Sequence, residues 1–62
     1  MIITLRRDAT PQQERTIVQK IKDLGFAPHK TQGAEVTIIG VIGENAIRTR
    51  DIFEAMAGVE IC

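Results

Sequence analysis

Residues 37–42 read Thr-Ile-Ile-Gly-Val-Ile, a run with apolar side chains at both odd and even positions. Residues two apart in a strand project from the same sheet face. One face would carry Ile38, Gly40 and Ile42, and the other Thr37, Ile39 and Val41. A run that is apolar on both sides is typical of a central strand covered on both faces. The sequence predicts such a strand over residues 36–42.

The shortness of the chain makes two covered faces hard to supply. Its 62 residues allow one domain, residues 1–62, and domains of this size lean on disulfides, metals or partners. Cys62 is the only cysteine, which excludes a disulfide within the chain and a cysteine-rich metal site. A partner surface is what remains.

The charge pattern bears on the class of partner. Eight basic and eight acidic residues are mixed along the chain, so no basic stripe could neutralise phosphates, and there is no Trp or Tyr to stack on bases. The apolar start precedes its arginines, the reverse of a signal peptide, and is too short to span a bilayer. We therefore expect a cytoplasmic protein that binds neither nucleic acid nor membrane.

The first half of the chain reads as a strand followed by a helix. Residues 2–5 are β-rich and predict a strand. Thr10 and Gln13 fit a capping box around the proline between them, and apolar residues then recur at helical spacing. Gly25 is placed for a left-handed C-cap. The helix is therefore expected to begin after Thr10 and to end at Gly25.

The next segment reads as a hairpin. Residues 26–31 form a strand that contains Pro28, and proline cannot donate to a sheet ladder, so this strand belongs at a sheet edge. Residues 32–34, Gln-Gly-Ala, predict the turn into strand 36–42.

The last segment predicts a second helix and a fourth strand. A helix is expected between residues 45 and 57, capped by Asn45 or Thr49, and residues 59–62 begin a strand that the end of the chain cuts short. The buried stripe expected for this helix consists of Ile52, Phe53 and Met56.

This order predicts an α+β, ferredoxin-like βαββαβ fold, an antiparallel sheet with two helices on one face. The other face would be left open, and its apolar side chains would pack on a second copy, a larger domain or both.

Candidates for catalysis are few. The chain has no serine, and a Cys–His pair would require Cys62 to lie beside His29. Gly40 and Gly43 could begin a phosphate loop, but the lysine and the other glycines of such loops are missing. Gly43 could equally end the strand, and Gly40 could allow close approach of a ligand or another backbone.

His29 and Thr31 have two readings. Lying two apart on an edge strand, they would project together, an imidazole and a hydroxyl beside a glycine turn and an apolar surface. That mixture suits a small ligand. Solvated polar residues are also expected on an edge strand.

The segment His29-Lys-Thr31-Gln-Gly33, followed by Ile-Gly-Val-Ile-Gly-Glu at 39–44, resembles the amino-terminal ferredoxin-like domain of 3-deoxy-D-arabino-heptulosonate 7-phosphate (DAHP) synthases, in the group typified by bacterial and thermophilic enzymes. That domain has a His-x-Ser-x-Gly turn and then an apolar strand that ends Ile-Gly-x-Ile-Gly-Asp. The resemblance extends over essentially the whole chain.

The resemblance implies a regulatory domain. In that family it precedes a (β/α)8 barrel that condenses phosphoenolpyruvate with erythrose 4-phosphate using a divalent metal. The small domain binds tyrosine or phenylalanine as feedback inhibitors between paired copies. The ligand-contacting residues of the family fall on His29 and Thr31, where Thr replaces Ser and keeps the hydroxyl. The pocket wall is expected from Gly33, Ile39 and Val41.

The barrel is absent from these residues, so we expect no enzyme activity and no cofactor in this chain alone. Two other functions remain open. The chain could be a structural oligomerisation module without a ligand. It could also be a small acylphosphatase-like hydrolase, although no arginine-bearing phosphate loop is evident.

Overall fold

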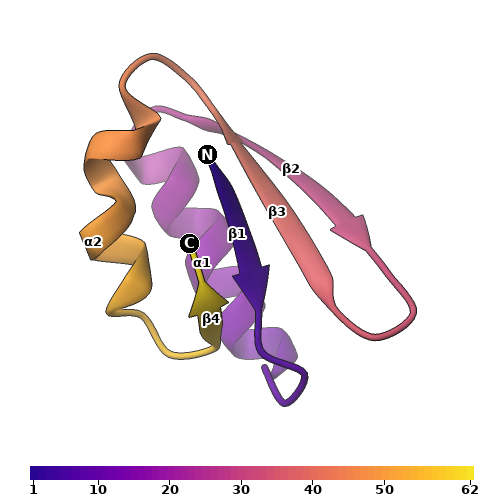
Figure 1. Cartoon of the computed structure of the whole chain (residues 1–62). Helices are drawn as coiled ribbons and strands as arrows, with labels where there is room; N and C mark the ends of the chain where they lie inside the picture. The colour runs from indigo at the N-terminus through magenta and orange to yellow at the C-terminus, as the bar shows by residue number, and fades with distance from the viewer.

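The computed structural model describes residues 1–62 as one four-stranded antiparallel sheet with its helices on one face (Figure 1). The strands lie in the order β2-β3-β1-β4. The elements in chain order are β1 Ile2–Leu5, α1 Pro11–Asp23, β2 Ala27–Gln32, β3 Thr37–Ile42, the 3-10 helix η1 Ala46–Thr49, α2 Arg50–Glu54 and β4 Val59–Ile61. The predicted ferredoxin-like α+β fold is confirmed.

Helix α1 begins and ends as the sequence predicts. The Thr10 hydroxyl accepts from the Gln13 N–H at 3.1 Å, and the Gln13 side chain accepts from the Thr10 N–H at 3.0 Å. At the other end, Gly25 has a φ of 85° and donates to the Lys22 carbonyl, while Phe26 donates to the Ile21 carbonyl. These two bonds form a Schellman motif, which satisfies carbonyls that the helix leaves free.

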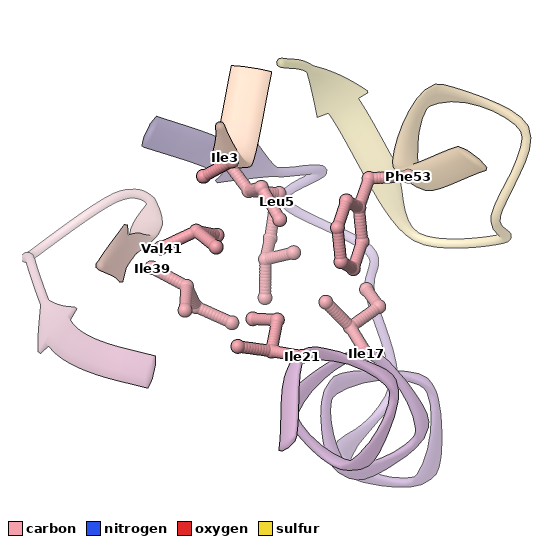
Figure 2. Close-up of a cluster of buried hydrophobic side chains, with 8 residues drawn as sticks. Ile3, Leu5, Ile17, Ile21, Ile39, Val41 and Phe53 are labelled. Atoms are coloured by element: carbon pink, nitrogen blue, oxygen red, sulfur yellow. The ribbon is translucent and has the colours of Figure 1, made fainter. Parts of the chain in front are cut away.

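The core lies between the sheet and the helices (Figure 2). In that view the sheet residues point towards α1, and Phe53 of α2 closes one side. No polar or charged residue is buried. The buried residues are Ile3, Leu5, Ile17, Ile21, Ile39, Val41, Ala46 and Phe53.

The second helical segment departs from the predicted single helix. It is a 3-10 turn followed by the short α2, and neither Asn45 nor Thr49 makes a side-chain cap. The Thr49 hydroxyl instead donates to the Ala46 carbonyl at 2.6 Å, and Asn45 takes a left-handed conformation with φ 61°. The 3-10 turn shifts the helical phase, so Phe53 is fully buried while Ile52 stays 43% exposed. The predictions of these two caps and of a buried Ile52 were wrong.

Strand β3 is central and β2 is an edge strand, as predicted. The Val41 N–H donates to the Met1 carbonyl at 2.7 Å, and the Met1 amine donates back at 3.3 Å, so the backbone groups of Val41 face β1. Its partner on β2, Pro28, therefore forms a non-hydrogen-bonded pair with it, and the backbone groups of Pro28 point away from β3. The missing N–H of proline costs the sheet no hydrogen bond.

No helix in the structure has both the length and the apolar character needed to cross a membrane.

Gly40 in β3 and Gly43 in the loop after it differ in the space they leave for a Cβ, and this difference is testable. A Cβ on Gly43 would overlap the Phe26 ring, whereas a Cβ on Gly40 would meet only ordinary contacts, 3.6 Å to the His29 carbonyl oxygen and 3.7 Å to its Cβ. We expect Gly43→Ala to destabilise the fold by about 1–3 kcal/mol through overpacking. Gly40→Ala should change the unfolding free energy by less than about 0.5 kcal/mol. Urea denaturation of both variants makes the comparison, and equal losses would contradict it.

Candidate functional site

The sheet face turned away from the helices carries the candidate site, and we call it the open face. Cross-strand partners project from the same face. The register aligns His29 with Gly40 and Thr31 with Ile38, and it continues across β1, where Gly40 meets Ile2. The open face comprises Ile2, Thr4, Ala27, His29, Thr31, Ile38, Gly40, Ile42 and Ile61.

Isoleucine dominates this face. Ile2, Ile42 and Ile61 are 62%, 61% and 59% exposed, and Ile38 is 37% exposed. Contiguous apolar patches on a soluble chain usually mark a contact with a ligand or another protein. The sequence predicted that both faces of β3 are covered. Within a single chain, only the face towards the helices is covered.

The polar groups of this face lie together. His29 and Thr31 both lie on β2 and are exposed. The neighbour of His29 across the sheet is Gly40, which has no side chain and leaves room beside the imidazole. A Cβ at that position would meet only ordinary contacts, so packing within the sheet does not demand glycine there.

The structure separates the other predicted site residues from this pair. Ile39 and Val41 are 0% and 2% exposed and belong to the core on the helix side. Their assignment to the same pocket wall as His29 is corrected, because adjacent residues of a strand point to opposite faces. Gly33 lies in the turn between β2 and β3, where its N–H donates to the Val36 carbonyl at 2.9 Å.

Sequence reasoning missed Ile38 and Ile42 as the apolar neighbours of His29 and Thr31. The signal was present in the hairpin. Four residues, 33–36, separate Gln32 from Thr37, and these two form the last pair of the ladder. Counting back from that pair places Thr31 opposite Ile38. The hairpin length therefore fixes which face of β3 joins the histidine.

No hollow in the structure is lined by His29 or Thr31. A ligand that touched both would lie on a flat face with one side in water. Pockets that hold small ligands usually enclose most of the ligand surface. The open face can therefore supply half of a binding site, and a second surface has to supply the rest.

A hollow of about 300 Å³ lies at the end of the sheet, between the β1–α1 loop and the hairpin turn that contains Gly33. Its charged groups already have partners. Arg7 pairs with Glu35 at 3.0 Å, and Arg6 pairs with Asp8 at 3.0 Å. The hydrogen bond to Asp8 raises the pKa of Arg6, and the same bond lowers the pKa of Asp8. The hollow has no free cationic group for a phosphate.

The arrangement offers no catalytic pair. Cys62 follows β4 and His29 lies on β2, at the opposite edge of the sheet. Partial burial, and then the nearby Glu54 carboxylate, raise the pKa of the Cys62 thiol and so disfavour the reactive thiolate. No group of three or more His, Cys, Asp or Glu side chains is placed to hold a metal ion.

The strand order, the helices on one sheet face and the exposed opposite face define a ferredoxin-like domain. The model of the DAHP synthase ferredoxin-like domain matches residues 1–61. The chain belongs to this family.

Two comparisons, one of sequence and one of structure, give the scale of the similarity to a DAHP synthase from Thermotoga maritima. The chain is 32% identical over 60 residues to a phospho-2-dehydro-3-deoxyheptonate aldolase. The aligned residues are 97% of this chain and 18% of the relative. A crystal structure of the DAHP synthase from that organism superposes with a TM-score of 0.86 at 30% identity, again over 97% of this chain and 18% of that one. The chain thus spans less than a fifth of the length of these relatives.

Because the two faces of β3 differ in burial, replacing neighbouring isoleucines by alanine should lower the unfolding free energy by different amounts. Ile39→Ala should destabilise the fold by about 2–5 kcal/mol, because it leaves a cavity in the core. Ile38→Ala, on the open face, should cost under about 1 kcal/mol. Denaturant unfolding of the two variants at low protein concentration measures both values. A larger loss for Ile38→Ala would mean that the faces are assigned the wrong way round.

Proposed function

We propose that this chain is the regulatory domain of a DAHP synthase and binds tyrosine or phenylalanine between two copies paired through their open faces. Family membership supports the role, and one observation carries the site. His29 and Thr31 stand exposed on an apolar face that has no hollow of its own. Pairing would supply the second wall that a small ligand needs.

The chemistry of the open face matches an aromatic amino acid. The imidazole of His29 can donate to a carboxylate, and the Thr31 hydroxyl can donate to it or accept from an ammonium group. Ile38 and Ile42 lie on the neighbouring strand and offer an apolar surface to the ring. Gly40 leaves space between them. Both parts of such a ligand would therefore find a partner.

A second copy is the occupant we favour for this face. On β1, β2 and β3 the face carries no Asp, Glu, Lys or Arg side chain, and Glu60 of β4 is paired with Arg6, so two copies could meet without opposing unpaired like charges. Pairing along the β2 edge is disfavoured, because the outward backbone positions there include Pro28, which has no N–H to give. Contact through the face leaves that edge free.

The size of the face suits a conditional contact. Four strands at ~4.8 Å spacing and up to six residues at ~3.3 Å rise span on the order of 400 Å². Stable interfaces bury about 800 Å² per partner. Pairing without ligand would therefore be weak. A ligand that contacts both copies would favour the pair to the extent that it binds this state better.

The parent protein would be a cytoplasmic transferase of aromatic amino acid biosynthesis, the shikimate pathway, in which this domain controls access to a (β/α)8 barrel. That barrel would contain the divalent metal that the reaction of this family uses. Acting alone, the chain would be a sensor without catalytic activity.

An oligomerisation module without a metabolite ligand is the alternative. The four exposed isoleucines favour it, because they are sufficient to explain pairing without any role for His29. The two functions differ in whether an aromatic amino acid changes the association.

Titration of L-tyrosine, then L-phenylalanine, into the chain tests the proposal. We expect saturable amide shifts at His29, Thr31 and Gly40 together with a rise in the paired fraction. His29→Ala should weaken binding at least about tenfold, because one hydrogen bond to a charged group is worth ~1.5–3 kcal/mol. Unfolding should be unaffected, since His29 is exposed. NMR and sedimentation velocity give the two readouts.

Lys30→Ala is the matched control. It removes a polar side chain from the same strand but on the helix side, where Lys30 pairs with Glu14 at 3.0 Å. It should bind as the unmodified chain does. Pairing that no aromatic amino acid alters would favour the module without a ligand. Equal losses of binding in both variants would argue against a site on the open face.

A further inference from the structure

On β1, β2 and β3 the open face has a single ionisable side chain, and this gives pairing a property beyond ligand binding. His29 is the only histidine in the chain. The other members of the face are apolar, except for the neutral hydroxyls of Thr4 and Thr31. Histidine is the side chain whose ordinary titration falls between pH 5 and 8. The face can therefore exist as a neutral or as a positively charged surface.

We propose that protonation of His29 separates the paired chains, so that the open face responds to acidity through one imidazole per copy. This inference rests on the proposed pairing. In the single chain His29 is exposed, and its charge is solvated. In a pair it would meet another apolar face with no carboxylate to accept its proton. Burying an unpaired charge is unfavourable, so the pair selects the neutral imidazole.

The charged groups around His29 do not offset this effect. On its own strand, Lys30 points to the helix side and is bound to Glu14 of α1. On β3 the partners of β2 carry no charge. The Met1 ammonium, immediately before β1, donates to the Val41 carbonyl of β3 and is itself positive. On β4, Glu60 is paired with Arg6 at 3.5 Å, and Glu44 is exposed in the loop after β3.

The sign of the pH dependence follows from linkage. A state that excludes protons is favoured at high pH and loses its advantage as pH falls. Pairing should therefore be stronger near neutrality than at pH 5.5. Histidine is the side-chain type that ordinarily changes charge in this range, so pH 5.5 and 7.0 are the two conditions to compare.

Sedimentation equilibrium of the ligand-free chain at pH 5.5 and 7.0 tests the inference. We expect the dissociation constant of the pair to be at least about tenfold larger at pH 5.5, since two imidazoles must stay neutral. His29→Gln, a neutral polar replacement, should pair equally at both pH values. Lys30→Gln should keep the pH dependence of the unmodified chain. Circular dichroism at both pH values shows that the fold is retained.

The outcomes separate this inference from the proposed function. Pairing that is equally strong at both pH values would overturn the role of His29 but leave the pairing itself. The same pH dependence in His29→Gln would also overturn it. A ligand-free chain that stays monomeric at both pH values would overturn this inference, whereas the ligand-dependent pairing is tested by the titration of aromatic amino acids.

A second measurement needs no variant. The imidazole resonances of His29 report its protonation by NMR. If pairing excludes the proton, the titration midpoint should move to lower pH as protein concentration rises, by reciprocity. A midpoint that does not change with concentration, in samples that do pair, would contradict the proposal.

Discussion

Every side chain of β3 points to one of two sheet faces, and the helices of the chain cover only one of them. Ile39 and Val41 are taken up by the core, while Ile38 and Ile42 remain on the open face. A chain of 62 residues cannot form a third layer from its own segments. The apolar second face therefore stays without cover in the single chain.

The orientation of β2 decides what this second face can recognise. Lys30 reaches Glu14 on α1 at 3.0 Å, which shows that its side of β2 faces the helix layer. His29 and Thr31, one residue on either side, must then face away. The hairpin register places them beside Ile38 and Gly40. One hairpin thus supplies polar groups, apolar surface and an unfilled position at the same place.

The parts of the fold that were predicted correctly depend on local sequence signals, each of which has a single structural interpretation. The capping box at Thr10, the left-handed glycine at Gly25 and the edge position of Pro28 were all predicted and all confirmed. The second helical segment was harder because its phase depends on the 3-10 turn, in which the Thr49 hydroxyl bonds to a carbonyl instead of capping α2. The five residues of α2 are too few for helical periodicity to reveal that change of pitch, so Ile52 was wrongly placed in the core.

The candidate site was also predicted correctly only where local sequence information was sufficient. His29 and Thr31 share a face by strand alternation alone, which needs no partner strand. The apolar neighbours depend on the hairpin register and on which face meets the helices, and there Ile39 and Val41 were chosen instead of Ile38 and Ile42. Since all four are apolar, composition could not separate them. Only the length of the turn distinguishes the two faces of β3.

The balance of forces on the open face explains why a contact there would be conditional rather than permanent. Its isoleucines favour burial, but the area is on the order of half of what stable interfaces bury per partner. In the proposed pair, a bound ligand would add a favourable term and a protonated imidazole an unfavourable one, so a weak contact would respond to both.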